Sequence, residues 1–245
     1  PRADAVLTQF LELGLATRDV AAALSFYESL GFVQAPVGAA WPHAYAVVTD
    51  GRLSLGLHGL ELEDPLLTFV TPGLRAQLER LHQLGIEVEH ARLDELSLNE
   101  ATFRDPARHA VRMLEARTFS PPSLPPGHES VLGYFEEYRL PTPDPAVAGR
   151  FWEELGFVAF AADDAATGRV VASSRDLNLA FEDLGLARPL LCFAAPDMRE
   201  RVARLRDRGY TFACRVPRAL EAHYREAALL EAPDDLQLLL VKAEE

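Results

Sequence analysis

An internal repeat restricts the fold of this chain more than any other feature of its sequence. The stretch DVAAALSFYESLGFV at residues 19–33 aligns with DPAVAGRFWEELGFV at residues 144–158. Both copies begin with aspartate, carry phenylalanine in the middle and end on Leu-Gly-Phe-Val. A longer stretch, residues 53–85, aligns without a gap with residues 177–209. Two matching blocks in the same order predict two copies of one module.

The expected module boundaries follow from the segment between the copies. Residues 119–130, FSPPSLPPGHES, are rich in proline and have the composition of a semi-rigid spacer. We therefore expect a first module at residues 1–118, this linker, and a second module at residues 131–245. Two modules in one chain could pair with each other as two single-module proteins pair in a dimer. The protein could therefore be a monomeric pseudo-dimer or a homodimer.

Within each copy the hydrophobic pattern changes between the period of a strand and that of a helix in a fixed order. Residues 10–17 alternate like a half-buried strand, and Asp19 stands where a helix N-cap is expected. A helical pattern follows up to Gly31. The predicted units are strand, helix and three strands, and each copy holds two of them. The remaining predicted elements of the first copy are strands at 32–35, 44–49, 53–58, 66–70, 87–92, 100–104 and 110–115 and a helix at 74–84.

Composition limits the partners rather than the fold. The formal net charge of −13 repels nucleic acid and anionic membranes and favours a neutral or cationic small-molecule ligand. Two cysteines without metal-ligand spacing are typical of reduced thiols, and no apolar run is long enough for a membrane span. The start of the sequence lacks the pattern of a signal peptide. We expect a cytoplasmic protein.

Three groups of residues carry a resemblance to a known family. LELGLATRDVAAALSFYESLGF resembles the opening strand and helix of the vicinal-oxygen-chelate superfamily, which includes glyoxalases, bleomycin-resistance proteins and extradiol dioxygenases. LLTFVTPGLRAQLERLHQLGI and LLCFAAPDMRERVARLRDRGY resemble the start of its second unit, and FRDPARHAVRMLEA its last turn and strand. The resemblance implies an α+β fold with four βαβββ units forming two cupped mixed sheets. Because this fold hosts unrelated functions, the resemblance says less about chemistry.

The resemblance also implies where a divalent metal would lie, and this sequence departs from that pattern. The first-strand position, usually histidine, holds Glu12 in one copy and Glu137 in the other. The fifth-strand position holds leucine in both copies, and the eighth-strand position holds Arg112 and Leu239. Glutamate is a workable metal ligand, but leucine cannot ligate and a guanidinium repels a cation. We therefore expect no metal cofactor, with one divalent metal as the alternative.

Strand alternation predicts which side chains line each cup. Leu53, Leu55 and Leu57 should face the helices, which directs the intervening residues into the first cup. We hypothesise that a Glu12–Arg112 ion pair occupies the position of the family's metal. Arg139 is the corresponding cation for the second cup. The candidate ligand-binding residues are Glu12, Ser54, His58, Arg112 and Trp41 in the first cup, with His43 beside Trp41 at its rim, and Glu137, Arg139, Asn178 and Glu182 in the second.

Three classes of function remain open. The first is a metal-free small-molecule binding protein. The second is a diverged glyoxalase-type lyase or isomerase, or a dioxygenase-like enzyme, in which Glu12, His58, Glu137 and Glu182 act as metal ligands or bases. The third is a non-catalytic assembly module with filled cups. No catalytic motif decides between them, so catalysis stays undecided; the divergence of cup-facing residues predicts one functional cup, the first.

Overall fold

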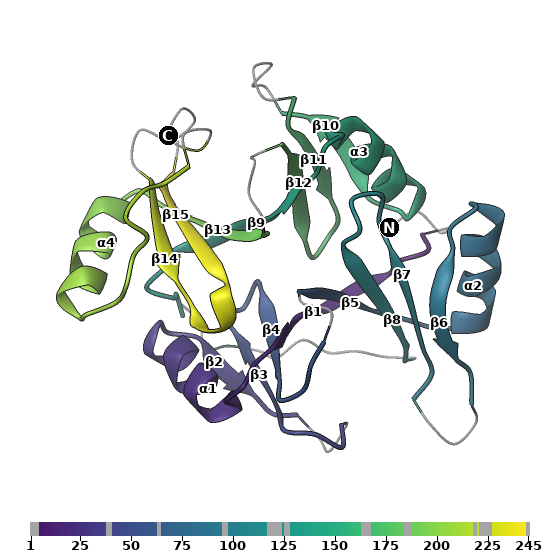
Figure 1. Cartoon of the computed structure of the whole chain (residues 1–245), viewed down its shortest axis with the longest axis horizontal. Helices are drawn as coiled ribbons and strands as arrows, with labels where there is room; N and C mark the ends of the chain where they lie inside the picture. Colours follow the sequence, from purple (N-terminus) through teal and green to yellow (C-terminus); the bar gives the residue numbers. More distant parts are fainter. Residues whose placement is uncertain are drawn as a thin grey trace.

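Two mixed β-sheets with helices packed on them form the chain, an α+β architecture as expected (Figure 1). The elements described below come from a computed structural model of the protein. The structure describes residues 5–37, 41–62, 65–94, 98–116, 124, 128–162, 168–183, 188–217, 220 and 227–243. Most of the predicted linker, residues 119–130, lies outside the described residues.

The first sheet has eight strands in the order β2-β3-β4-β1-β5-β8-β7-β6. Parallel pairing joins β1 to β4 and β5 to β8, and an antiparallel β1–β5 pair joins the two halves of the sheet. The strand and helix predictions for this half of the chain are confirmed to within one or two residues. The elements are β1 (Gln9–Ala16), α1 (Val20–Ser29), β2 (Val33–Ala35), β3 (Tyr45–Thr49), β4 (Ser54–His58), β5 (Leu66–Thr71), α2 (Leu74–Gln83), β6 (Val88–Arg92), β7 (Glu100–Arg104) and β8 (Ala110–Glu115).

The second sheet has seven strands in the order β10-β11-β12-β9-β13-β15-β14. Its β9–β12 and β13–β15 pairs are parallel and its β9–β13 pair is antiparallel, which is the pairing of the first sheet. The elements are β9 (Tyr134–Pro141), α3 (Pro145–Glu154), β10 (Val158–Ala161), β11 (Val170–Ser173), β12 (Asn178–Glu182), β13 (Leu190–Ala195), α4 (Met198–Asp207), β14 (Ala227–Glu231), the short 3-10 helix η1 (Pro233–Asp235) and β15 (Gln237–Lys242).

The last of the four units differs from the other three. After α4 the described residues contain only two strands, β14 and β15, where the other units have three. An isolated bridge between Phe212 and Leu230 stands at the place of the third strand. Three units are therefore complete βαβββ units, and the fourth has its first hairpin strand reduced to one bridge.

The beginnings and ends of α1 and α3 are fixed by the same residues in both halves. Asp19 accepts a hydrogen bond from the backbone of Ala22, and Asp144 accepts one from Val147, each at 3.0 Å. These bonds satisfy amide groups that have no partner within the first helical turn. Gly31 and Gly156 follow the helices with φ of 92° and 112°, a conformation that favours glycine. The Asp and Gly positions of the repeat thus mark where the helices start and stop.

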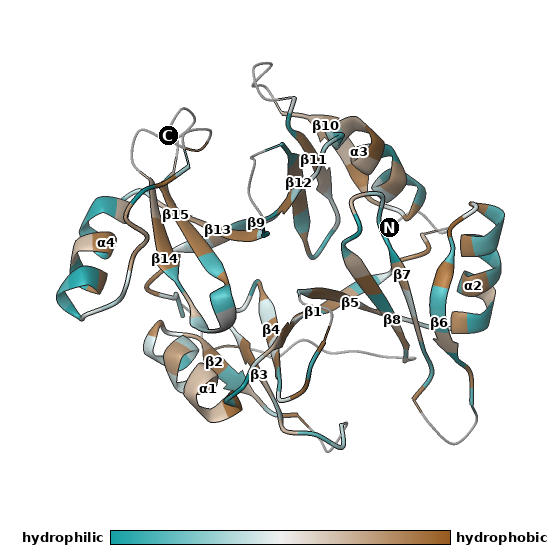
Figure 2. Cartoon of the chain, viewed as in Figure 1, coloured by the Kyte–Doolittle hydropathy of each residue, from teal (hydrophilic) through white to brown (hydrophobic). Residues whose placement is uncertain are grey.

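Each strand of the first sheet separates its residues by face. Leu13, Leu55 and Phe69 belong to the hydrophobic core, whereas Glu12 and His58 lie on the opposite face, as the alternation predicts. The same core contains Tyr138, Phe181 and Leu191 of the second sheet, so one core serves both sheets. In Figure 2, α2 and α4 carry more hydrophilic residues than α1 and α3.

The two sheets contact each other through the first helices of each half. Figure 1 shows α1 and α4 at one end of the molecule and α2 and α3 at the other. At the first end Phe26 packs against Tyr210 at 5.9 Å between ring centroids, and at the second Phe69 packs against Trp152 at 6.3 Å. In keeping with these contacts, α1 and α3 carry more apolar residues than α2 and α4.

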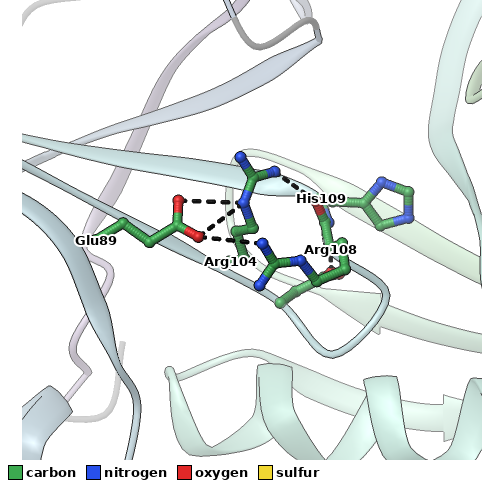
Figure 3. Close-up of polar contacts among 5 residues, drawn as sticks. Glu89, Arg104, Arg108 and His109 are labelled. Atoms are coloured by element: carbon green, nitrogen blue, oxygen red, sulfur yellow. Dashed lines mark hydrogen bonds and ion pairs between the residues drawn. The ribbon is translucent and has the colours of Figure 1, made fainter.

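A turn between β7 and β8 also ties the two sheets together. Buried Asp105 accepts hydrogen bonds from the backbone of Ala107 and His109 and from the indole of Trp152 in α3. Glu89 of β6 holds the outer side of the turn by contacting Arg104 and Arg108 (Figure 3). His109 Nε2 lies 3.0 Å from the carbonyl oxygen of Pro141, at the end of β9.

No helix among the described residues is long and apolar enough to cross a membrane.

Candidate functional site

We call the polar face of the first sheet the first cup; it carries Glu12, Gly14, Gly56, His58, Thr68 and Arg112. Glu12 of β1 lies at its centre and is 1% exposed. A Cβ atom added to Gly56 would overlap the Glu12 carboxyl group, so this side chain extends across the space that the glycine leaves. One carboxylate oxygen accepts a hydrogen bond from the hydroxyl of Tyr45. The glycine therefore decides where the carboxylate lies.

His58 of β4 connects this carboxylate to the rim of the cup. Its Nε2 lies 3.0 Å from the other Glu12 oxygen, and its Nδ1 lies 3.0 Å from Nε2 of His43. His58 is fully buried, whereas His43 is partly exposed. Burial lowers the pKa of His43, and the nearby His58 and Arg112 lower it further, so His43 is favoured in its neutral form. Glu12, His58 and His43 form one chain of hydrogen bonds.

Arg112 of β8 lies on the other side of Glu12. Its Nη2 donates to Thr68 Oγ1 at 3.2 Å and is 3.7 Å from Glu12 Oε1, and its guanidinium carbon lies 4.9 Å from the ring centroid of Trp41. The side chain is almost buried, and burial lowers its pKa. Its Nε atom is buried without a hydrogen-bond partner in the described part of the chain. Such an atom costs free energy until an acceptor reaches it.

A cavity of about 390 Å³ adjoins Arg112. Leu66 and Phe103 supply apolar surface, and carboxylates and His90 supply polar surface. Two of the carboxylates already have cationic partners, because Glu89 contacts Arg104 and Glu100 contacts Arg92 at 2.8 Å. The lining residues are Glu61, Leu62, Leu66, Glu89, His90, Glu100, Thr102, Phe103, Ala110 and Arg112.

The structure brings most of the predicted first-cup residues together. Glu12, His58, Arg112 and Trp41 contact one another directly or through one neighbour. The predicted Glu12–Arg112 pair is present, but its separation of 3.7 Å is longer than the 3.0 Å between Glu12 and His58. Ser54 is the first residue of β4. Among the described residues it makes no side-chain hydrogen bond to this group.

Sequence reasoning missed some residues of the first cup. Tyr45, which donates to Glu12, was not a candidate; its position opposite His58 in the β3–β4 register is the signal that pairs them. Burial and the Glu12 carboxylate raise the pKa of Tyr45, so its hydroxyl stays protonated as a donor. His43, which the sequence placed at the rim, bonds to His58, and His90, which was not a candidate, lines the cavity.

An arginine occupies the centre of the second cup, the corresponding face of the second sheet. Arg139 is 1% exposed and lies 2.9 Å from Glu137 and 2.9 Å from Glu182, as the prediction of a substitute cation requires. Arg169, which the sequence did not single out, also contacts Glu137. Asn178 lies apart from them, because it is exposed and donates to the backbone of Glu136.

The other half of the second cup is filled with apolar side chains. A cluster separate from the main core covers this part of the sheet, and Leu220, from the segment after α4, is completely buried in it. Burial raises the pKa of the Cys192 thiol within this cluster, which keeps it protonated. The cluster consists of Leu190, Cys192, Ala194, Leu220, Leu229, Leu239 and Val241.

The residues present do not fit the metal that the family resemblance implies. In the described ranges no three His, Cys, Asp or Glu side chains are placed to hold a metal ion. In the first cup both nitrogens of His58 are engaged, and Arg112 lies at one of the four ligand positions. In the second cup Arg139 holds both carboxylates. In each cup an arginine guanidinium lies beside the carboxylates that would otherwise be candidates to bind the metal ion.

Comparison with known proteins shows which solved structures share this fold. No family model and no curated protein matches the sequence. Among solved structures, a catechol 2,3-dioxygenase is similar with a TM-score of 0.63 and 15% identity, covering 98% of this chain and 89% of that chain. The chain shares the fold of dioxygenases and glyoxalases.

Two further structures support that statement. A mutant of homoprotocatechuate 2,3-dioxygenase from Brevibacterium fuscum has a TM-score of 0.63 and 14% identity, covering 100% of this chain and 74% of that chain. The Mn(II)-bound glyoxalase from Novosphingobium aromaticivorans has a TM-score of 0.59 and 13% identity, covering 99% of this chain and 84% of that chain. At these identities the likeness concerns the fold alone.

Proposed function

We propose that this chain is a cytoplasmic small-molecule binding protein of the vicinal-oxygen-chelate superfamily, built from two copies of one module and working without the superfamily's metal. Its ligand occupies the first cup and is neutral or cationic. The supporting observation is Arg112, whose buried Nε atom has no hydrogen-bond partner among the described residues and whose side chain lines a cavity of about 390 Å³. That volume lies in the range of small-molecule sites.

The charges around the cavity favour this class of ligand. Glu61, Glu89 and Glu100 line it together with Arg112. An anion would meet three carboxylates, two of them paired with arginines. A neutral molecule with an acceptor oxygen would bond to Arg112 and place its apolar part against Leu66 and Phe103. A cationic group on the same ligand would face the carboxylates. The negative net charge of the whole chain also favours a neutral or cationic ligand over an anionic one.

The second cup supports the other part of the proposal, that one cup alone binds. Its centre is occupied by Arg139 and its flank by Leu220 and the apolar cluster. A non-catalytic filled cup describes this half of the chain, whereas the first cup retains a cavity. The metal-dependent enzyme is the weaker alternative, because a guanidinium lies within 4 Å of the candidate carboxylate ligands in both cups.

A small-molecule screen by thermal shift tests the proposal, because a ligand that binds the folded state raises the unfolding temperature. For any hit, Arg112→Leu should weaken binding by about 1–3 kcal/mol through loss of a hydrogen bond to a charged group. Glu137→Gln, in the second cup, is the matched control and should leave the affinity nearly unchanged. Weaker binding in the control alone would move the site to the second cup and refute the assignment.

A further inference from the structure

The two sheets end in four edge strands, β2 and β6 in the first sheet and β10 and β14 in the second. An edge strand leaves backbone N–H and C=O groups without a partner, and proteins protect such edges against pairing with another chain. Charged residues, proline, a very short strand or a covering segment supply this protection.

Three of the four edges are protected. β2 has three residues and is followed by Pro36. β6 carries Glu89 and Arg92, each of which forms an ion pair with a residue of β7. The edge of β14 is covered in part by the chain after α4, because the backbone of residues 211–213 bonds to that of residues 229–231.

β10 has none of these protections. Its sequence, VAFA, contains no charged residue and no proline, and among the described residues no strand pairs with its outer side. Val158 and Phe160 are 64% and 51% exposed, the highest values among the large hydrophobic residues of the described chain. Ala35 corresponds to Phe160 in the first half and is buried. The second half therefore exposes an apolar edge where the first half protects one.

The hydrogen bonds of β10 show which of its backbone groups point outward. The backbone of Ala162 donates to the carbonyl of Arg169, so the alternation of an antiparallel pair directs the backbone groups of Phe160 towards β11 as well. The N–H and C=O groups of Ala159 and Ala161 then point away from the sheet. A second β10 strand running antiparallel can bond to them when Ala159 of each strand faces Ala161 of the other.

We propose that β10 is the contact surface between two copies of this chain, which pair edge to edge about a twofold axis at Phe160. A symmetric dimer needs a surface that is complementary to itself. This strand meets that condition in its backbone hydrogen bonds and in its apolar side chains. The two Phe160 rings lie opposite each other in a non-hydrogen-bonded pair, where cross-strand side chains are closest. The two seven-stranded sheets thereby become one continuous sheet.

Charge restricts where two copies can meet. Each chain has a formal net charge of −13, so two copies repel each other wherever their acidic surfaces approach. Residues 155–162, LGFVAFAA, contain no charged side chain, and β10 lies within them beside α3 (Figure 1). The uncharged strand lets two acidic molecules approach. A different protein attracted by the negative charge would bind at acidic residues, which this strand lacks.

The size of the contact sets the strength of the dimer. Stable interfaces bury roughly 1,200–2,000 Å² in total, and smaller ones belong to transient complexes. A strand of four residues lies at the small end of this range. We therefore expect a reversible dimer whose population rises with protein concentration.

Sedimentation velocity of the full-length protein tests the pairing over an about hundredfold range of concentration. The average mass of the wild-type protein should rise towards that of two chains. Phe160→Lys places two like charges opposite each other across the twofold axis and should abolish the rise. Leu84→Lys is the matched control, because it makes the same charge change at an exposed hydrophobic residue at the end of α2. It should dimerise as the wild-type protein does.

Disulfide formation tests the register of the pair. The background is Cys214→Ser, which removes the exposed thiol. Phe160→Cys places two thiols opposite each other, and mild oxidation should give a covalent dimer. Val158→Cys is equally exposed but faces Ala162 of the other copy, so its two thiols lie about 13 Å apart and should remain separate.

Three results would overturn the proposal. The first is a wild-type protein that stays monomeric at every concentration, which would leave this strand to a partner of another kind. The second is a dimer that Phe160→Lys does not weaken. The third is equal cross-linking of the two cysteine variants, because the twofold axis at Phe160 requires that they differ.

Discussion

Gly56 and Gly14 face each other across the β1–β4 pair, and replacing each with alanine provides a sharp test of the first cup. At Gly14 an added Cβ would lie 3.5 Å from Leu66, an ordinary van der Waals contact. At Gly56 it would overlap the Glu12 carboxyl group. We expect Gly14→Ala to be tolerated and Gly56→Ala to be strongly destabilising.

The magnitude follows from the groups that must move. Overpacking a closed site costs about 1–3 kcal/mol. Displacing the carboxylate also breaks its bonds to Tyr45 and His58, at about 1 kcal/mol each. Alanine returns about 0.4–1 kcal/mol by restricting the unfolded chain. Gly56→Ala should therefore cost about 2–4 kcal/mol, whereas Gly14→Ala should lie close to zero or stabilise slightly.

Urea unfolding measures both variants, because a shift of the midpoint at constant slope reports the change in stability. A third and a fourth protein, Glu12→Ala with and without Gly56→Ala, complete a double-mutant cycle. Without the carboxyl group the clash disappears, so Gly56→Ala should cost less than about 1 kcal/mol in that background. Equal costs for the two glycine variants, or no coupling between residues 56 and 12, would refute the placement of Glu12.

Three further predictions follow from the structure. Elemental analysis of the purified protein should find no stoichiometric divalent metal; about one Zn, Ni, Mn or Fe per chain, lost in Glu12→Ala or Glu137→Ala, would favour the enzyme alternative. Calorimetry should show one unfolding transition, because one hydrophobic core includes residues of both sheets; two separate transitions would contradict it. Burial raises the pKa of Asp105 in the folded protein, so the folded state binds this proton more tightly than the unfolded state. Stability measured by urea should consequently fall as pH rises from about 4 to the raised pKa, and Asp105→Asn should flatten that part of the profile.

The fold was predictable because its signals are local and repeated. Asp19 and Asp144 cap helices, glycines end them, and alternating leucines mark the buried face of each strand. These features depend on neighbours in sequence, and their duplication separates them from chance. Among the described residues, one strand of the fourth unit is reduced to a single bridge. This reduction was not predictable, because the residues up to Phe212 retain enough alternation to resemble the other copy.

The site was predictable only in part because its contacts depend on register. Alternation placed Glu12, His58 and Arg112 on one face, and the structure shows them there. Tyr45 meets His58 through the antiparallel β3–β4 pair, and Arg169 reaches Glu137 from the segment before β11. Neither contact leaves a spacing in the sequence. The preference of Glu12 for His58 over Arg112 also follows from geometry, because the space above Gly56 directs the carboxylate towards β4.

Arg112 and Arg139 are both buried arginines beside glutamates, yet the structure gives them different roles. Arg139 lies between Glu137 and Glu182 at 2.9 Å from each, and both carboxylates are nearly inaccessible to solvent. Arg112 is 3.7 Å from a carboxylate that has two other donors, Tyr45 and His58. Arg139 therefore neutralises buried charge, whereas Arg112 lies beside a carboxylate that already accepts hydrogen bonds from other residues.

Leucine substitutions at both positions separate these roles. Arg139→Leu removes the cation between two buried carboxylates, and breaking such a pair costs about 3–5 kcal/mol. Arg112→Leu loses one hydrogen bond to Thr68, at about 1 kcal/mol, and the stacking on Trp41, at about 0.5–1 kcal/mol. Urea unfolding should therefore show the larger loss of stability for Arg139→Leu. Equal or reversed losses would mean that Arg112 is needed for folding. Its Nε atom, which has no hydrogen-bond partner in the described ranges, would then no longer support a ligand in the first cup.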